Sequence, residues 1–277
     1  MINTNIISHA ASPLSMKEEQ GDESHSSVIK VGGAVVEDPE QLKELLDEFT
    51  KIEGPKVLVH GGGRSATKLA SQLGIESQMV GGRRITDAET LRVVTMVYAG
   101  LVNKNIVAQL QARGILALGL TGADLDLIRS HRRPITPEGL DFGFVGDVDR
   151  TAGERLQQLL QLGITPVIAP LTHDGQGQLL NTNADTVAQS IAVAIASAGV
   201  SLTFCFELPG VLSNPSDPST LIPHLTEKDF QALVANGTIA GGMIPKLENA
   251  FSALRAGVGS VRITDIHHLQ GGTLITL

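Results

Sequence analysis

The chain has 277 residues, of which 42% are hydrophobic and 18% are charged, and this composition excludes an intrinsically disordered protein. A net charge of −8, the absence of tryptophan and the single tyrosine argue against binding of nucleic acid through a basic face or an aromatic platform. The single cysteine, Cys205, excludes an intrachain disulfide framework and a zinc site built from several cysteines. No apolar run approaches the roughly 20 residues that cross a bilayer, so we expect a cytoplasmic protein without a membrane partner.

The N-terminal residues differ from the rest of the chain. Residues 1–27 are rich in Ser, Asn, Glu and His and show no apolar periodicity, which predicts a disordered polar tail. The opening has no basic residue, and Ile6-Ile7 is too short for the apolar part of a signal peptide. Met16 precedes a short acidic run and is an alternative start of translation. We expect ordered structure to begin at Val28.

From there on, short β-branched strands alternate with amphipathic helices. Strands are expected at 28–31, 57–60, 115–120, 165–169, 202–208, 260–264 and 274–277. Helices are expected at 39–51, 65–73, 86–113, 151–162, 185–197 and 246–256. The strands are apolar throughout, which is typical of parallel strands covered on both faces, so the predicted fold class is α/β with a mostly parallel sheet.

Glycine clusters follow the strands, at the edge where sheets of this kind bind ligands. Lys30 stands at the end of the first strand, before Gly32-Gly33, and a compact ammonium beside glycine N–H groups suits a phosphate. The loop His60-Gly61-Gly62-Gly63 follows the next strand and predicts backbone contact with a ligand at a helix N-terminus. A third glycine turn, Gly241-Gly242, leads into a helix with Lys246 near its start.

The second glycine loop has a rival interpretation, because the same string forms the oxyanion hole of some α/β-hydrolases. That function needs a G-x-S-x-G nucleophile elbow, but Ser65 lies in Gly63-Arg64-Ser65-Ala66-Thr67, which lacks the second glycine. The chain also has no G-x-x-x-x-G-K-[ST] P-loop and no G-x-G-x-x-G after a strand. A nucleotide enzyme would therefore need another phosphate cradle, which two glycine loops and lysines can supply.

Two further segments carry groups that suit a carboxylate. Arg83-Arg84 follows two glycines, and a guanidinium fork grips carboxylates well, although a solvated turn explains the pair equally well. Asn181-Thr182-Asn183-Ala184-Asp185 opens a helix, where Asn and Asp are common N-caps. Three such groups in five residues exceed what capping requires, so Asp185 could orient lysines and an Asn amide could bind a substrate.

Taken together, the chain resembles the amino-acid kinase family over residues 28–277. The matching strings, in the family's order, are Ile29-Lys30-Val31-Gly32-Gly33, Val59-His60-Gly61-Gly62-Gly63, Gly82-Arg83-Arg84-Ile85-Thr86, Asn103-Lys104, Asn181-Thr182-Asn183-Ala184-Asp185 and Gly242-Met243-Ile244-Pro245-Lys246. The resemblance implies an open αβα sandwich with an acyl-glutamate-binding lobe at 28–194 and a nucleotide-binding lobe at 195–277. It also implies ATP-dependent phosphorylation of the γ-carboxylate of N-acetyl-L-glutamate in arginine biosynthesis, with Mg²⁺ carried by ATP.

The resemblance also implies roles for individual residues. The catalytic residues would be Lys30, Lys246 and Asp185, two lysines that stabilise the transferring phosphoryl group and a carboxylate that holds them. The acyl-glutamate would be bound by Gly62, Gly63, Arg84, Asn181 and Asn183. ATP and its phosphates would be bound by Gly32, Gly33, Glu207, Gly210, Gly241 and Gly242. No protein ligand for a metal is expected.

The chain departs from the family pattern in two places. The usual T-D-V-x-G string of the nucleotide lobe is here Phe206-Glu207-Leu208-Pro209-Gly210. The chain end is short and residues 1–27 lack an apolar period, which predicts a homodimer that free L-arginine does not inhibit. Two alternatives remain open: an N-succinyl-L-glutamate kinase, if Arg64 or Arg83 meets the added carboxylate, and a catalytically inactive ligand-binding or sensor protein of the same fold.

Overall fold

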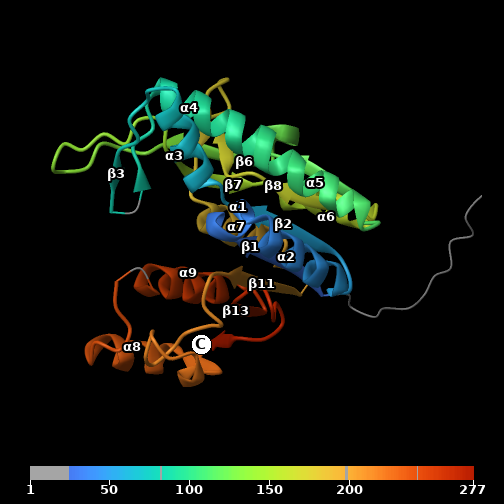
Figure 1. Cartoon of the computed structure of the whole chain (residues 1–277), viewed down its shortest axis with the longest axis vertical. Coiled ribbons are helices and arrows are strands. Elements are labelled where there is room, and N and C mark those ends of the chain that lie inside the picture. The colour runs from blue at the N-terminus through green and yellow to red at the C-terminus, as the bar shows by residue number, and fades with distance from the viewer. Residues whose placement is uncertain (1–24, 82, 197–198, 242) are drawn as a thin grey trace, which may run out of the picture.

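The structure is a computed structural model, and it describes residues 25–81, 83–196, 199–241 and 243–277 (Figure 1). Residues 1–24 of the predicted tail, and Gly242 of the predicted nucleotide site, lie outside the described residues. The predicted start of ordered structure at Val28 is wrong by two residues. Ser26 and Ser27 already pair with Val200 and Ser201, because their backbone groups complete the first strand.

A mostly parallel sheet of eight strands forms the centre of the molecule, which confirms the predicted fold class. In spatial order its strands are β12 (His224–Thr226), β14 (Thr273–Thr276), β13 (Ser260–Thr264), β11 (Val200–Cys205), β1 (Ser26–Val31), β2 (Lys56–His60), β8 (Thr165–Ile168) and β5 (Ala117–Leu120). Every neighbouring pair is parallel except β13 and β14. The strand predicted over 202–208 ends early, at Cys205.

The helices cover both faces of this sheet (Figure 1). They are α1 (Gly33–Glu37), α2 (Pro39–Lys51), α3 (Gly63–Gln72), α4 (Ala88–Thr95), α5 (Asn103–Ala112), α6 (Gly153–Gln161), α7 (Ala184–Ala194), α8 (Glu227–Ala235) and α9 (Met243–Arg255). The predicted lobes share the sheet, since β11 lies directly beside β1. The lobe boundary at residue 194 therefore falls just before the chain crosses to the other half of one continuous sheet.

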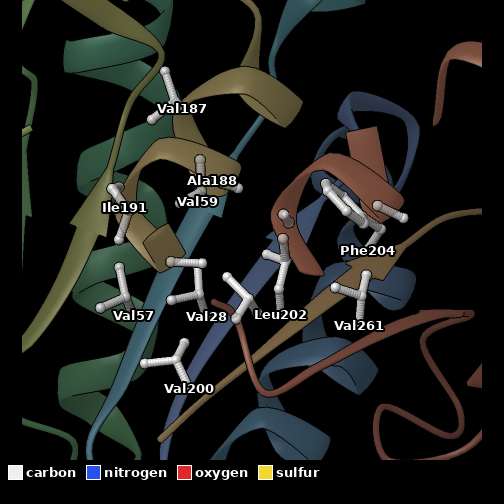
Figure 2. Close-up of a cluster of buried hydrophobic side chains, with 14 of the residues drawn as sticks. Val28, Val57, Val59, Val187, Ala188, Ile191, Val200, Leu202, Phe204 and Val261 are labelled. Atoms are coloured by element: carbon white, nitrogen blue, oxygen red, sulfur yellow. The ribbon is translucent and has the colours of Figure 1, made fainter. Parts of the chain in front are cut away.

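Successive side chains of β1 point to opposite faces of the sheet, and this alternation decides which of them reach the site. Val28 belongs to the apolar cluster on the α7 and α9 face, together with Val57 and Val59 of β2 (Figure 2). Ile29 and Val31 belong to the cluster on the opposite face. Side chains two apart in a strand share a face, so Lys30 lies on the Val28 side, toward α7 and α9.

The helix predicted over 86–113 is continuous but not uniform. Between α4 and α5 it contains a π-helical segment, Met96–Val102, and Asp87 caps its N-terminus through the N–H of Thr90. By length and composition alone, Ala88–Gln111 could cross a membrane. Its Val93, Val94 and Val97 are buried in the core, as in the central helix of a soluble protein.

Sequence periodicity did not predict a second sheet of four strands. In spatial order these are β10 (Leu179–Asn181), β9 (Leu171–His173), β6 (Ile128–Arg132) and β7 (Gly146–Thr151); a separate hairpin joins β3 (Met79–Val80) and β4 (Arg83–Arg84). β6 and β7 carry charged side chains that pair across the strands, such as His131 with Asp149 at 2.6 Å. Without an apolar run they lacked the signal on which strand prediction depends.

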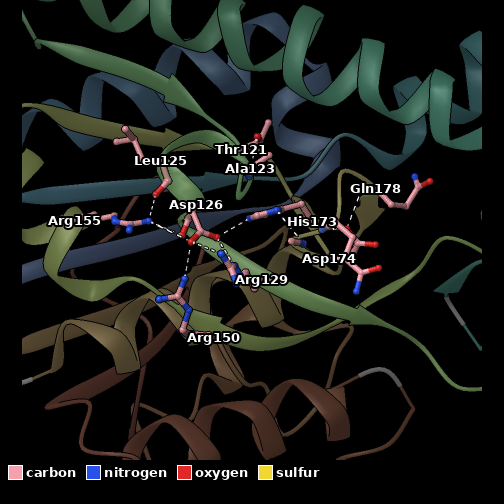
Figure 3. Close-up of polar contacts among 12 residues, drawn as sticks. Thr121, Ala123, Leu125, Asp126, Arg129, Arg150, Arg155, His173, Asp174 and Gln178 are labelled. Atoms are coloured by element: carbon pink, nitrogen blue, oxygen red, sulfur yellow. Dashed lines mark hydrogen bonds and ion pairs between the residues drawn. The ribbon is translucent and has the colours of Figure 1, made fainter.

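Asp126 fixes the turn into β6 (Figure 3). Its carboxylate lies 2.6 Å from Arg129 Nε, 2.7 Å from Arg150 Nη2 and 3.0 Å from His173 Nε2. These contacts, Arg129 above all, hold the pKa of Asp126 well below its usual value. Leu125 and Asp126 both adopt left-handed backbone conformations, at φ 53° and 50°, which the surrounding charges stabilise locally.

Candidate active site

The two glycine loops at the ends of β1 and β2 form one cradle. The N–H of Gly61 donates to the carbonyl of Val31 at 3.1 Å, which ties the second loop to the first strand. A Cβ atom on Gly61 would lie 2.9 Å from the nitrogen of Gly33, and one on Gly33 would lie 3.3 Å from the nitrogen of Gly62. The loops therefore approach so closely that side chains are excluded, and backbone N–H groups gather at this point.

His60 holds this cradle in shape. Its side chain is completely buried, with Nδ1 2.7 Å from the carbonyl of Gly61 and Nε2 3.1 Å from the amide nitrogen of Asn103. The same amide nitrogen donates to the carbonyl of Val167 at 2.9 Å. Because an amide NH₂ only donates, Nε2 accepts and Nδ1 carries the proton. Burial lowers the pKa of His60 to about 4, so the ring stays neutral near pH 7.

The predicted lysines and their carboxylate come together beside the cradle. Lys30 Nζ lies 2.7 Å from Asp185 Oδ1, and the two side chains are only 8% and 16% exposed. Lys246, at the start of α9, and Lys30 both lie over the ring of Phe206, with Nζ to centroid distances of 3.6 and 4.7 Å. Burial, and then the charge of Lys30, lower the pKa of Lys246, whereas the carboxylate of Asp185 opposes the shift.

The N-terminus of α7 places Asp185, and both interpretations of the Asn-rich segment find support there. Asn183 caps the helix, since its Oδ1 accepts from the N–H groups of Asp185 and Thr186 at 2.8 and 3.2 Å. Asn181 lies at the end of β10, and its amide donates to Thr86 Oγ1 at 3.0 Å. Both asparagines also line a cavity.

This first cavity, of about 210 Å³, collects every residue predicted to bind an acyl-glutamate. Those residues are Gly62, Gly63, Arg84, Asn181 and Asn183. Arg84 is buried, and its Nη2 donates to the carbonyl of Gly63 and to Thr67 Oγ1, each at 2.8 Å. These bonds join the hairpin of β3 and β4 to the glycine cradle and fix the guanidinium at the cavity wall.

Among the lining residues with polar side chains, Tyr98 and Arg133 were not identified from the sequence. Tyr98 lies in the π-helical segment and packs against Gly62, where a Cβ atom would come within 2.9 Å of the ring. Arg133 pairs with Asp147 through Nη2, and its Nη1 is buried without a hydrogen-bond partner among the described residues. Tyr98 could have been noticed as the single tyrosine within an apolar helix. Arg133 offered no such signal.

The two arginines that could bind the added carboxylate of a succinyl group lie in different places. Arg83 lines the first cavity next to Arg84. Arg64 is exposed, pairs with Glu207 at 3.1 Å and is not among the described residues that line that cavity. Arg64 instead connects the N-terminus of α3 with the segment after β11.

A second cavity, of about 420 Å³, adjoins the first at Gly63. Among its lining residues are predicted members of the catalytic and nucleotide sets: Lys30, Gly32, Gly33, Asp185, Glu207, Gly210 and Lys246. Gly241 lies in the turn before α9 and is not part of the described lining. Leu208 and Met243 add apolar surface, which suits the base of a nucleotide.

A further hollow of about 640 Å³ lies beside the second cavity and shares Arg64, Phe206 and Glu207 with it. Glu37, Glu44 and Asp265 make its wall acidic. These carboxylates would repel a triphosphate, whereas Lys30 and Lys246 make the second cavity cationic. Within the described ranges, no three His, Cys, Asp or Glu side chains gather to hold a metal ion.

A cavity lined by Arg84 and two asparagines adjoins, at the glycine cradle, a larger cavity that holds two lysines, and this arrangement suits a phosphotransferase for small molecules. Residues 27–265 match the model of the amino acid kinase family, and the chain belongs to this family. It is 58% identical over 263 residues to an acetylglutamate kinase of Bacteroides fragilis, covering 94% of this chain and 99% of that protein. A second acetylglutamate kinase, from Bacteroides thetaiotaomicron, is 60% identical over 239 residues, covering 86% of this chain and 92% of that protein.

A solved structure agrees with these matches. The crystal structure of a Streptococcus mutans protein superposes with a TM-score of 0.73 at 29% identity, covering 91% of this chain and 98% of that one. The predicted fold and family are thereby confirmed.

Proposed function

We propose that this chain is an enzyme that transfers the γ-phosphoryl group of ATP to the γ-carboxylate of N-acetyl-L-glutamate. The observation that carries the proposal is the gathering of Lys30, Lys246 and Asp185 in the second cavity, which adjoins the first cavity at Gly63. The name shared by relatives that are 58–60% identical supports the acyl-glutamate as acceptor and places the reaction in amino-acid biosynthesis.

The first cavity suits the acceptor. Arg84 and Asn181 offer guanidinium and amide donors to the α-carboxylate, and the amide nitrogen of Asn183 is left available by its capping role. The γ-carboxylate then lies at Gly62 and Gly63, next to the second cavity. There the N–H groups of the cradle, with those of Gly32 and Gly33, orient the reacting oxygens.

The chemistry needs no general base, because a carboxylate is already a nucleophile. Its oxygen forms a bond to the γ-phosphorus while the bond to the β,γ-bridging oxygen breaks and ADP leaves. Lys30 and Lys246 neutralise charge on the transferring phosphoryl group, and Asp185 keeps Lys30 in place. Mg²⁺ bound to ATP would supply further neutralisation of the phosphates, and Asp185 and Glu207 are the carboxylates of the second cavity that could hold it.

The assembled site also distinguishes the enzyme from an inactive sensor of the same fold. A sensor could bind an acyl-glutamate through Arg84 alone and would not require two lysines and a carboxylate in the second cavity. Lys246 is partly desolvated, which lowers its pKa and is costly unless its ammonium group meets an anion.

We propose a cytoplasmic homodimer, since both substrates are small metabolites and one sheet edge is apolar. Leu116 and Leu118, on or beside the edge strand β5, are 57% and 37% exposed, and Leu101 of the neighbouring helix is 67% exposed. Sedimentation equilibrium measures this directly. A monomer or a hexamer would contradict it.

The experiment that tests the function couples ADP release to NADH oxidation and traps the acyl phosphate as a hydroxamate. We expect ATP-dependent hydroxamate with N-acetyl-L-glutamate and none with free L-glutamate, which lacks the acyl group. Lys30→Ala is the matched control for contaminating kinases. ADP release without hydroxamate, or equal turnover of free glutamate, would overturn the proposal.

A further inference from the structure

Phe206 occupies a position that the reaction described above leaves unexplained. It follows β11 directly, at the place where the family's T-D-V-x-G string has a threonine. We propose that the Phe206 ring is a platform that positions the ammonium groups of Lys30 and Lys246 for phosphoryl transfer through cation–π contacts. This inference rests on the proposed function for its kinetic consequences, and on geometry alone for the contacts.

The geometry is that of two cations on one ring. Lys246 Nζ lies 3.6 Å and Lys30 Nζ 4.7 Å from the ring centroid, both within the roughly 6 Å over which a ring face attracts a cation. The ring itself is held in place. It stacks on Phe204 at 6.2 Å with an interplanar angle of 12°, and the N–H of Phe206 donates to the carbonyl of Thr264 at 2.8 Å.

A ring suits this position better than a second carboxylate. Two neighbouring ammonium groups repel each other, and the nearby carboxylate of Asp185 pairs with Lys30. An aromatic face attracts both cations without a full negative charge, so it does not repel the incoming phosphates. It also accepts no conventional hydrogen bond from the lysines, which leaves most of their N–H donors free for phosphate oxygens.

Stacking on the purine base is the other role open to an aromatic residue in a nucleotide cavity. The faces of the Phe206 ring already contact two lysines and Phe204, which leaves little of the ring for a base. Leu208 and Met243 provide apolar surface elsewhere in the same cavity. The contacts therefore favour the lysine platform.

The test weakens the attraction of the ring face for cations and leaves the shape of the ring nearly unchanged. Phe206 is replaced by 4-fluoro-, 3,5-difluoro- and 3,4,5-trifluorophenylalanine, which withdraw electron density from the ring face in steps. We expect kcat to fall stepwise, by roughly tenfold across the series, while KM for N-acetyl-L-glutamate changes less than about twofold. The same series at Phe251 is the matched control, since that buried ring packs on Phe230 at 5.3 Å and has no cation over it among the described residues.

A second measurement does not depend on activity. Trace acylation followed by mass spectrometry gives the pKa of Lys246 in each variant, and we expect this pKa to fall along the Phe206 series and to stay constant along the Phe251 series. Phe206→Tyr should retain kcat and the Lys246 pKa, whereas Phe206→Leu should lower both.

Failure of the proposed function and failure of the Phe206 platform give different experimental results. A wild-type chain that makes no hydroxamate refutes the proposed function, and the Lys246 pKa series then decides the platform alone. With an active wild type, a flat pKa series or a flat kcat series at Phe206 overturns the platform. A kcat loss in the Phe206 series equal to that in the Phe251 series also overturns the platform, because such a loss would come from disturbed packing.

Discussion

Lys30 and Asp185 form an ion pair of 2.7 Å that joins the end of β1 to the N-terminus of α7. Both side chains are largely sheltered from water, although the two residues lie far apart in the sequence. The pair therefore fixes the position of Lys30 relative to the helix that Asn183 caps, and Asn183 lies in the wall of the first cavity.

Asp185→Asn is expected to lower kcat by roughly 100-fold or more, because Lys30 loses the charge that orients it. It should also lower the free energy of unfolding, since an ammonium that is 8% exposed is left without its partner. Urea denaturation and steady-state kinetics measure the two effects. The double variant Lys30→Met with Asp185→Asn should regain stability but not activity. Recovery of activity in the double variant would remove the pair from the mechanism.

Lys246 should set the alkaline limit of activity. Burial and Lys30 lower its pKa below 10.5, so kcat/KM should decline as the pH rises through that lowered pKa and the ammonium is lost. Stability should change in the opposite sense: between the folded pKa and 10.5 the unfolded chain binds more protons, so this group's contribution becomes more favourable as the pH rises. In Lys246→Arg the side chain stays charged at alkaline pH, so the alkaline limb of the kcat/KM profile should move to higher pH. An unchanged limb would assign it to another group.

Arg84→Ala should raise KM for N-acetyl-L-glutamate by at least about tenfold and KM for ATP by less than about twofold, because a guanidinium–carboxylate contact is lost in only one cavity. Arg84 also bonds to Thr67, so Thr67→Val is the matched control for loss of that structural contact. Equal increases in both KM values, or the same change in Thr67→Val, would mark Arg84 as structural.

His60 should act on kcat through the glycine cradle. His60→Leu removes the donor to Gly61 and leaves the amide of Asn103 without one acceptor, so we expect a kcat loss of about tenfold or more with little change in either KM. Asn103→Leu removes the same network from its other end. Because the two residues share one hydrogen bond, the double variant should lose less than the product of the single losses. Multiplicative losses would show that the residues act separately.

The sequence contained the parts of the site that lie at the ends of apolar strands. β1 and β2 were predicted within two residues because their β-branched runs are buried, and Lys30 was expected near the end of the first strand beside Gly32-Gly33, where it lines the same cavity as these glycines. Arg133 was missed because neither β6 nor the residues after it show a local pattern, and Tyr98 was missed because its place in a predicted helix did not show that it faces a cavity. Their positions depend on contacts across the fold, such as that of Arg133 with Asp147.

The acyl group is decided by the charges at the wall of the first cavity. We expect kcat/KM for N-acetyl-L-glutamate to exceed that for N-succinyl-L-glutamate, since an additional buried carboxylate needs an unpaired cation. Arg133 already pairs with Asp147, Arg64 pairs with Glu207, and Arg83 is exposed.

The measurement is the ratio of kcat/KM for the two acyl-glutamates in wild type, Arg83→Ala and Arg133→Ala, with Arg64→Ala as the control outside the cavity. Arg133 deserves its own variant because its buried Nη1 is the donor left without a partner among the described residues of that wall. A wild-type preference for succinyl that collapses in Arg83→Ala or Arg133→Ala, but survives in Arg64→Ala, would reverse the expected acyl group and identify the arginine that binds it.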